Sequence, residues 1–370
     1  MTQNPFRAYA KMADSSSKFG NVDGHFVVTE KVHGAHFCVV IDLQCGGTVR
    51  FAKRSEILAP EENFYGYLDS NIPKQCQNVS PEIVRQIAGL AERNQLAGHR
   101  FQDVQRIRVH GELFGGKYPG IASPTSVHGP VQNGVWYSNK MEFFAYDIAI
   151  EVCKPDTDGA AQKIERYLDY KDFRSVCLSS GLQCVHHIFI GTFQQCLDVN
   201  PEFQSRIAEI LGLPPLPDNL AEGLVIKACK EDSNIYGNNT TRRIMKRKIA
   251  RFSEKQYSMS RQEFLASTKH KARDTAVEAT SALEIEALMY EGLACVTEAR
   301  YHAVVSKLGP EIVADAVIDA YVKDVIEDLG EEDREMFCRL DSGAQRDIED
   351  KVREAIRDLV PANSDGTFAA

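Results

Sequence analysis

Short runs in which hydrophobic and polar residues alternate fill the first two thirds of the chain. Eight such runs, rich in β-branched and aromatic residues, predict strands at 26–32, 36–43, 48–54, 106–115, 141–152, 184–193, 222–228 and 242–249. Between these strands, apolar residues at helical spacing predict helices at 80–96, 161–178 and 200–213. The first of them has Ser80 as its N-cap and Pro81 in its first turn. Strands separated by helices without a regular βαβ alternation predict an antiparallel α+β domain.

The pattern changes after Ser260. The stretches 282–309, 310–330 and 333–360 carry apolar residues at helical spacing, and strand patterns are absent from them. We place a boundary near 252–262 and expect an α+β domain over residues 1–255, followed by a small all-α domain over residues 262–370.

Composition narrows the class of protein. With 370 residues the chain is long enough for two hydrophobic cores. Its ten cysteines include no CxxC pair, which favours reduced thiols over a zinc site or a disulfide scaffold. The chain has no membrane-spanning apolar run and its first residues lack the apolar core of a signal peptide. We therefore expect an intracellular protein without a membrane partner, and leave an organelle address open.

The charge is uneven along the chain. A net charge of −9 argues against nonspecific nucleic-acid binding as the main activity. Basic residues nevertheless crowd together between Arg242 and Arg273, and acids dominate beyond Glu311. A local basic stripe of this kind can contact a phosphate backbone.

One lysine stands out in the sequence KVHG at 31–34. An amine attacks phosphorus only when it is neutral, and free lysine has a pKa of about 10.4, so a nucleophilic Lys31 needs burial or cationic neighbours. Taken alone, the same pattern fits a solvated lysine beside a turn, and both interpretations stay open at this point.

Two later segments offer further candidates. Glu112 precedes a glycine-rich turn, where its carboxylate could accept hydrogen bonds from a ribose or simply end a strand. Alternation places Phe144 and Tyr146 on one strand face and Ala145 and Asp147 on the other. An aromatic ring here could stack on a base, worth about 1 to 3 kcal/mol, or could pack in the core.

The last two strands of the first domain carry charged pairs. Glu222 and Lys227 lie at opposite ends of one strand, so a shared site requires a bend, which Gly223 permits. Lys246 and Lys248 lie on one face of the next strand. A bound phosphate would relieve the repulsion between these two lysines, as would solvent.

Six segments together resemble a known set of motifs. EKVHGAHF, FAKRSEILAP, VHGELFGG, EFFAYDI, EGLVIK and MKRK occur in the order of the nucleotidyltransferase motifs of covalent ligases and capping enzymes. Over about residues 26–252 the sequence is most similar to that of the phage RNA ligase 2 family, which includes the trypanosome RNA-editing ligases. The resemblance implies an antiparallel-sheet nucleotidyltransferase (ATP-grasp-like ligase) domain. Capping enzymes and DNA ligases continue with a β-barrel of the OB type, which the helical pattern after Ser260 does not match.

The resemblance also implies a reaction. In the family, the lysine equivalent to Lys31 attacks the α-phosphate of ATP and expels pyrophosphate, and AMP then passes to an RNA 5'-phosphate. The RNA 3'-hydroxyl displaces AMP and closes the phosphodiester. We expect an ATP-dependent RNA ligase that uses Mg²⁺ and seals RNA with 3'-OH and 5'-phosphate ends, held as a duplex or bridged. Its oligomeric state is not indicated.

The resemblance assigns roles residue by residue. Those that handle the phosphates are Lys227, Lys246 and Lys248, which neutralise charge, and Glu222, which holds metal-bound water and so helps to bind the metal. Those that hold the nucleotide or the RNA end are Glu30 against the adenine, Tyr146 stacked on it where the family more often has Phe, Glu112 at the ribose, Arg54 at the AMP or RNA end, and His33 in sealing.

Two parts of the resemblance are less complete. The family usually has Asn where this chain has His36, and we expect this histidine to retain function with greater acid sensitivity. Arg300 and Asp324 fall where the C-terminal domain of the phage-type ligases has residues linked to RNA sealing, although surface ion pairing or helix capping fits them equally well. A noncatalytic RNA-binding or scaffold protein and an adenylyltransferase with another acceptor remain as alternatives.

Overall fold

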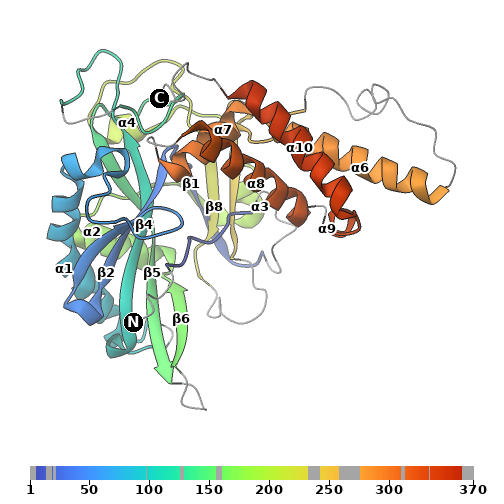
Figure 1. Cartoon of the computed structure of the whole chain (residues 1–370). Helices are drawn as coiled ribbons and strands as arrows, with labels where there is room; N and C mark the ends of the chain where they lie inside the picture. The colour runs from blue at the N-terminus through green and yellow to red at the C-terminus, as the bar shows by residue number, and fades with distance from the viewer. Residues whose placement is uncertain are drawn as a thin grey trace. The chain divides into compact units, whose positions relative to one another are not determined.

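The computed structural model describes residues 6–13, 19, 22–96, 98–125, 129–155, 161–231, 242–257, 276–309, 313–332 and 334–360. The chain divides into two compact units, Met1–Ile249 and Ala250–Ala370. Strands occur in the first unit and helices make up the second (Figure 1).

Two antiparallel sheets form the first unit. The strands are β1 (His25–Glu30), β2 (Ala35–Asp42), β3 (Thr48–Ala52), β4 (Val104–Gly115), β5 (Met141–Pro155), β6 (Ala161–Tyr167), β7 (His187–Thr192), β8 (Gly223–Ala228) and β9 (Ile244–Lys248). The five-stranded sheet has the order β3-β2-β4-β5-β6, and the four-stranded sheet has the order β7-β1-β8-β9. All eight predicted strands are present, with shifted ends.

The 161–178 prediction is wrong in its first half. Residues Ala161–Tyr167 form β6 on the edge of the larger sheet, and only Tyr170–Ser180 form a helix, α2. Register with β5, in which Glu151 lies opposite Glu165, holds the segment as a strand. Glu165 gains a buried ion pair with Arg108 in this way. Tertiary pairing of this kind overrides a local helical pattern.

The helix predicted at 80–96 begins a full two turns earlier. It is α1 (Ile72–Glu92), Pro81 lies inside it, and Asn71 occupies the cap position that the sequence assigned to Ser80. The Ser80 hydroxyl instead donates to the Cys76 carbonyl at 2.6 Å within the helix. A proline removes one helical hydrogen bond, but burial of Ile83 and Ile87 on the same face keeps the helix continuous.

The helix predicted at 200–213 is largely absent. Only α4 (Ile207–Ile210) is helical there, and a second short helix, α3 (Phe193–Leu197), precedes it. The Asn200 side chain accepts a hydrogen bond from the Glu202 amide at 3.0 Å, which closes a local turn. Four 3-10 helices complete the described short elements, η2 (Leu43–Cys45), η3 (Phe64–Asp69), η4 (Phe101–Asp103) and η5 (Ala250–Phe252).

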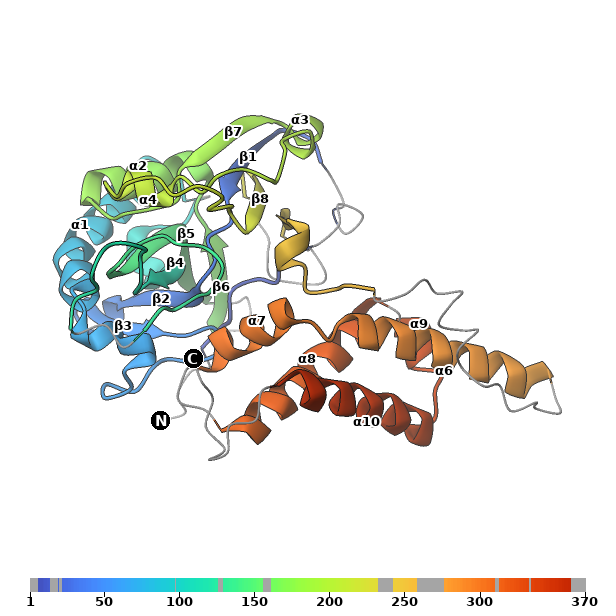
Figure 2. The ribbon, with the colours of Figure 1, turned by 90° about the horizontal axis from the view of Figure 1, so that it is seen from above.

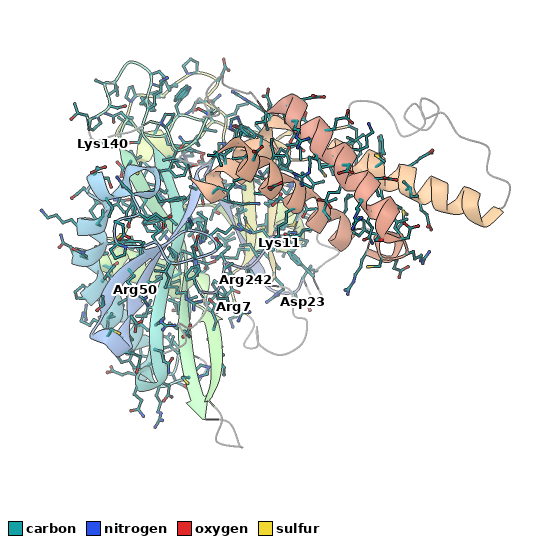
Figure 3. The ribbon with its side chains drawn as sticks, in the orientation of Figure 1. Arg7, Lys11, Asp23, Arg50, Lys140 and Arg242 are labelled. Carbon is teal, nitrogen blue, oxygen red and sulfur yellow. The ribbon has the colours of Figure 1, made fainter. Side chains whose placement is uncertain are left out.

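The two faces of the five-stranded sheet differ in polarity. Helices α1 and α2 lie along one face of the sheet (Figure 2). Apolar residues of that face and of the two helices form a core that includes Phe37, Val109, Ile148, Ile87 and Phe173. The other face carries ion pairs that cross all five strands. They run from Arg50 through Asp42, Arg106, Glu151, Arg108 and Glu165 to Arg7, and Figure 3 labels the two end residues. Pairing offsets the cost of burying these charges.

The second unit is helical. Its helices are α6 (Ala276–Ala294), α7 (Glu298–Leu308), α8 (Ala314–Glu332), α9 (Arg334–Phe337) and α10 (Ser342–Leu359). The predicted run 282–309 breaks before α7, where the Thr297 hydroxyl caps the helix by accepting from the Arg300 amide at 3.1 Å. Leu288, Val325 and Val352 lie in a core that belongs to this unit.

The α+β class with a helical C-terminal part is confirmed. All ten cysteines are free thiols, as expected. No helix in the described part of the chain is long and apolar enough to cross a membrane. The basic residues predicted to contribute to a stripe at 269–273 lie outside the described residues.

Candidate active site

Lys31 lies at the centre of a charged cluster at one end of the four-stranded sheet. Its backbone amide donates to the Gly223 carbonyl at 2.9 Å, which places the residue beside the start of β8. Its ammonium group is 2.7 Å from one Glu222 carboxylate oxygen, and the Lys248 ammonium is 2.8 Å from the other. The Nδ1 atom of His33 lies 3.4 Å from the oxygen that Lys31 contacts. Lys31 is therefore a partly buried residue with a fixed ion-pair partner, rather than a solvated surface charge.

Glu222 is ionised in this cluster. Although burial raises the pKa of Glu222, the ammonium groups of Lys248 and Lys31 and the ring of His33 hold that pKa well below its ordinary value. Only 1% of its surface is exposed. The carboxylate therefore fixes two lysines and a histidine that are far apart in the sequence.

Two glycines make this arrangement possible. Gly223 has φ of 148°, and a Cβ there would lie 2.0 Å from the Arg247 carbonyl oxygen of the neighbouring strand. A Cβ at Gly34 would lie 2.2 Å from the Leu113 carbonyl oxygen. Both distances are impossible for a side chain, so these positions require glycine for close backbone approach. The bend at Gly223 was expected to bring Glu222 and Lys227 into one site, but Glu222 contacts Lys31 and Lys248 whereas Lys227 contacts Asp147.

Lys227 belongs to a second cluster, which joins the two sheets. Its ammonium group donates to the Asp147 carboxylate at 2.8 Å and to the Tyr146 carbonyl at 3.1 Å. Arg242, labelled in Figure 3, donates to the second Asp147 oxygen at 2.6 Å. The Tyr9 hydroxyl also donates to that oxygen, at 2.7 Å. Asp147 is fully buried, and these donors hold its pKa below its usual range although burial raises it.

A β-bulge explains why Asp147 reaches the site. The expectation that Tyr146 and Asp147 point to opposite faces is wrong, because the β4 and β5 register shifts between His110, which faces Asp147, and Gly111, which faces Ala145. Tyr146 is the extra residue, and both its side chain and that of Asp147 lie next to Tyr9. Bulges commonly redirect side chains next to active sites in this way.

His36 and Glu112 come from the polar side of the five-stranded sheet, and Arg54 follows the end of β3 by two residues. His36 lies opposite Glu112 in the β2 and β4 pairing, and its Nδ1 atom is 2.5 Å from the Tyr146 hydroxyl. Burial, together with the Arg54 charge, lowers the pKa of His36 to about 3, so the imidazole is neutral. The acid sensitivity expected from titration of this histidine is therefore not supported near pH 6.

Glu112 carries a proton at neutral pH. Burial raises its pKa to about 8, although the charges of Lys31, Arg54 and Lys248 oppose the rise. A protonated carboxyl group can both donate and accept a hydrogen bond, whereas an ionised one only accepts. The influence of these three cations shows that Glu112 lies near the Lys31 cluster.

The Glu30 carboxylate forms hydrogen bonds within the protein. Its two carboxylate oxygens accept hydrogen bonds from the Ser205 hydroxyl at 2.6 Å and from the Arg206 amide at 3.2 Å. Burial raises the pKa of Glu30 to about 7 despite these bonds. In this structure Glu30 anchors the 205–206 segment at the side of the site.

The remaining predicted residues of the first unit are partly placed. The His33 amide donates to the Tyr137 hydroxyl at 3.0 Å, which positions the loop after Lys31. Lys246 is half-buried in β9, two residues before Lys248 and paired with Val225 of β8. Arg247 points the other way and donates to the Val199 carbonyl at 3.1 Å. The alternation predicted for β9 is therefore present.

Arg300 and Asp324 meet in the helical unit. Arg300 is 3.1 Å from Asp324 and 2.8 Å from Asp328, and only 4% of its surface is exposed. Lys307 also pairs with Asp324. These contacts tie α7 to α8, so both residues have an evident structural role.

Sequence reasoning missed Asp147, Arg242, Tyr9 and Tyr137 as site residues. Asp147 stands directly after the aromatic position in EFFAYDI, and this juxtaposition was the available signal. Tyr9 and Arg242 lie outside the six motifs and reach Asp147 only through the fold. The bulge that brings them together leaves no mark in hydrophobic periodicity.

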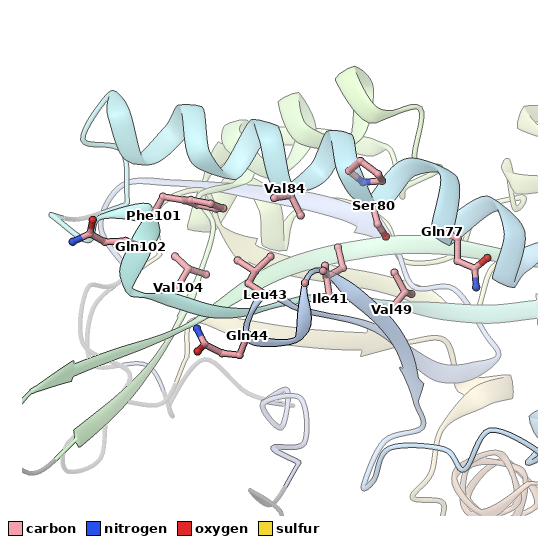
Figure 4. Close-up of a pocket in the computed structure, with 13 residues that line it drawn as sticks. Ile41, Leu43, Gln44, Val49, Gln77, Ser80, Val84, Phe101, Gln102 and Val104 are labelled. Atoms are coloured by element: carbon pink, nitrogen blue, oxygen red, sulfur yellow. The ribbon is translucent and has the colours of Figure 1, made fainter.

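A cavity on the other side of the sheet is unsuited to nucleotides. It has a volume of about 560 Å³ and lies between α1 and the β2–β3 hairpin (Figure 4). Its described lining includes Leu43, Val49, Val84 and Phe101 and carries no charged side chain. A triphosphate requires cations, which the space around Lys31 supplies instead.

The residues around Lys31 fit ATP. Lys31, Lys248 and Arg54 supply positive charge, and the buried Nε2 atom of His36 has no hydrogen-bond partner among the described residues. Such a buried atom calls for a partner that a ligand can provide. Magnesium fits in a different way, because the described residues contain no group of three or more His, Cys, Asp and Glu placed to bind it. Mg²⁺ in phosphate-transfer sites is held mainly by the phosphates and water.

Known proteins that are similar to this chain are RNA ligases. The family model described as RNA ligase matches residues 24–248. RNA-editing ligase 1, mitochondrial, of Trypanosoma brucei brucei is 29% identical over 262 residues, which are 65% of this chain and 52% of that protein. RNA-editing ligase 2, mitochondrial, of the same organism is 30% identical over 224 residues, or 56% of this chain and 50% of that protein.

A solved structure of an archaeal ATP-dependent RNA ligase covers 98% of this chain and 68% of that chain, at 13% identity and a TM-score of 0.35. The chain spans about half the length of the curated relatives it matches. The family match covers more than half of the chain and includes Lys31, Glu222 and Lys248. The chain therefore belongs to the RNA ligase family.

Proposed function

We propose that this protein is an ATP-dependent RNA ligase that joins 3'-OH and 5'-phosphate RNA ends through a covalent Lys31–AMP intermediate. The observation that carries the proposal is the partly buried Lys31 amine, which lies 2.7 Å from Glu222 in a cluster that also contains His33 and Lys248. Family membership supports the same reaction. Duplex or bridged RNA is the substrate form we propose.

In the first step, Lys31 attacks the α-phosphate of ATP and expels pyrophosphate. The attack requires a neutral amine, and the Glu222 carboxylate lies within hydrogen-bonding distance of the proton that must leave. We propose that Lys248 and Lys227 neutralise phosphate charge as it develops, together with Lys246, which shares the face of Lys248. A magnesium ion supplies further charge stabilisation when bound, and Glu222 is its proposed contact through water.

The nucleotide would be held by residues of both sheets. Tyr146 presents an aromatic ring for the adenine, and we propose that Glu30 borders the same base. Glu112 faces the ribose as a protonated acid, which can donate to one hydroxyl and accept from another. Neutral His36 offers its unpartnered Nε2 in the same region, and Arg54 contributes charge toward the AMP or the RNA end.

In the later steps, AMP passes to the RNA 5'-phosphate, and the RNA 3'-hydroxyl then displaces AMP. We propose that His33 acts in this sealing, because its position beside Glu222 links it to the same phosphates. Arg300 and Asp324 are proposed to assist sealing from the helical domain, in addition to their structural pairing. The proposed domains are residues 1–255 for adenylation and 262–370 for this supporting part.

The test is labelling with ATP. Purified protein is incubated with α-labelled ATP and magnesium, with and without a nicked RNA duplex. We compare the parent with Lys31→Arg, which keeps a positive charge toward Glu222 but provides no amine nucleophile. The matched control is Lys74→Ala, an exposed lysine on α1.

The parent and Lys74→Ala should take up label and release it as the nick closes, whereas Lys31→Arg should take up none. Label that never leaves with RNA would point to another acceptor. Absence of label on parent protein that is free of prebound AMP would leave an RNA-binding role without catalysis.

A further inference from the structure

Two cysteines behind the site form an unusual pair. Cys177 lies in the last turn of α2, and Cys184 follows the turn that α2 makes at Gly181. Each thiol influences the pKa of the other, and both side chains are buried in the core of the first unit, with 0% and 4% of their surfaces exposed. The proposed ligase reaction uses neither of them.

An arginine is directed at one of the two sulfur atoms. The Arg174 guanidinium donates to the Cys184 Sγ atom at 2.8 Å and to the Val185 carbonyl at 3.4 Å. Within the described part of the chain, Arg174 forms no ion pair with a carboxylate. A guanidinium without a carboxylate partner stabilises a thiolate at the sulfur it contacts.

Other buried thiols in the protein behave in the opposite way. Burial raises the pKa of Cys76 to about 12, and it also raises the pKa of Cys196. At Cys184 the pKa is lowered, first by the hydrogen bond from Cys177 and then by Arg174, although burial opposes the change. The pKa of Cys177 is raised, so this thiol keeps its proton and acts as the donor.

We propose that Cys184 is a peroxide-reactive thiolate and that Cys177 is its resolving thiol. The Cys184 thiolate attacks one oxygen of hydrogen peroxide, breaks the O–O bond and becomes a sulfenic acid, and the hydroxide released takes a proton to give water. The Cys177 sulfur then attacks the Cys184 sulfur, its proton leaves with the sulfenic oxygen as a second water, and a disulfide forms. Two thiols are oxidised and one peroxide is reduced to two waters.

The pair is connected to the proposed nucleotide site. The Ala145 amide donates to the Gln183 carbonyl, and the Val185 amide donates to the Ala145 carbonyl, both at 2.9 Å. Ala145 directly precedes Tyr146, whose carbonyl accepts from Lys227. Lys227 also lies over the ring of Phe173 on α2, 5.3 Å from its centroid. A disulfide would bring two sulfurs to about 2.05 Å and so shift both α2 and the segment beside Tyr146.

The chemistry can be tested by mass spectrometry without any ligase assay. The exposed thiols are first removed as Cys45→Ser and Cys338→Ser. The reduced protein is treated with hydrogen peroxide, blocked with N-ethylmaleimide and digested with trypsin. Cleavage after Arg174 and Arg206 releases peptide 175–206, which contains three cysteines, Cys177, Cys184 and Cys196.

After peroxide, this peptide should carry one maleimide in place of three and should have lost two hydrogens. Cys177→Ser should stop at a sulfenic acid that dimedone traps on Cys184, and Cys196→Ser should still form the disulfide. Arg174→Gln should slow the oxidation by roughly tenfold, because the thiolate loses its guanidinium. Three maleimides on the treated parent, or oxidation at the same rate in Arg174→Gln, would overturn the assignment.

The link to the site has its own readout, which rests on the proposed function. Lys31 labelling from α-labelled ATP should fall after oxidation and recover with dithiothreitol, and Cys184→Ser should label equally before and after peroxide. Unchanged labelling of a protein that mass spectrometry shows to be oxidised would overturn the link. If even the reduced protein takes no label, the proposed function has failed, and the thiol assignment stands or falls on the peptide masses.

Discussion

At the scale of single residues, His36 shows how burial changes the consequence of a substitution. The folded protein keeps His36 neutral, with a pKa of about 3, whereas the unfolded chain binds a proton below about pH 6.5. Acid therefore favours the unfolded state, and the free energy of unfolding falls as the pH drops below 6.5. In the parent, this effect should lower the free energy of unfolding by up to about 2 kcal/mol between pH 7.5 and pH 5. His36→Asn should abolish that part of the loss, and urea denaturation at both pH values measures it.

The same variant separates stability from catalysis. Because the imidazole stays neutral above pH 5, the rate of Lys31 labelling should have the same pH profile in parent and His36→Asn between pH 6 and 8. A parent profile that falls near pH 6 while the variant profile does not would show that His36 titrates in the working enzyme and would contradict the burial argument.

Asp147 is the residue on which two buried cations depend. It accepts from Lys227 and Arg242, and none of its surface is exposed. Asp147→Asn leaves those cations without full compensation, so we expect a loss of about 3 to 5 kcal/mol in the free energy of unfolding. Tyr9→Phe removes one neutral donor from the same carboxylate and should cost only about 1 kcal/mol. Equal losses in the two urea titrations would mean that charge compensation does not matter here.

At the scale of elements, hydrophobic periodicity predicted the helices and strands whose conformation depends on residues nearby in the sequence. The eight strands and the helices of the second unit follow their hydrophobic patterns. The edge strand β6, the early start of α1 at Ile72 and the bulge at Tyr146 depend on partners distant in sequence. The site divides in the same way. The sequence motifs indicated Lys31, Glu222 and Lys248 together, whereas the contacts of Asp147 with Arg242 and Tyr9 join residues distant in sequence and became evident only in the fold.

At Gly223, the close approach of β8 to β9 also determines the position of a site residue, Lys248. Gly223→Ala would place a Cβ 2.0 Å from the Arg247 carbonyl oxygen at an unfavourable φ, which must displace β9 and with it Lys248. We expect a loss of roughly 100-fold or more in the rate of Lys31 labelling, in line with the cost of misplacing catalytic groups by about 1 Å.

The matched control for this substitution is Gly330→Ala, in helix α8, where a Cβ meets nothing within 4 Å. This variant should be stabilised by about 0.5 to 1 kcal/mol, because alanine is the better helix former, and should label at the parent rate. Normal labelling of Gly223→Ala would show that the close approach of β8 and β9 is dispensable.

At the scale of the whole molecule, each of the two units has a large hydrophobic core of its own among the described residues. One includes Val176 on α2 and belongs to the first unit, and the other includes Val352 on α10 and belongs to the second. Both side chains are almost fully buried, at 1% and 0% exposed. Independent cores of this kind favour separate unfolding transitions, for which a single melting temperature is not a complete description.

We therefore expect two thermal transitions that can be assigned by matched substitutions. Val176→Ala and Val352→Ala each remove two buried methyl groups from a helix and should each cost about 2 kcal/mol, but in different transitions. AMP attached to Lys31 should raise only the transition that Val176→Ala lowers, because ligand stabilises the part of the protein that binds it. Differential scanning calorimetry of the two variants, with and without prior ATP treatment, measures both effects. A single transition that both variants lower equally would mean that the two units unfold as one cooperative body.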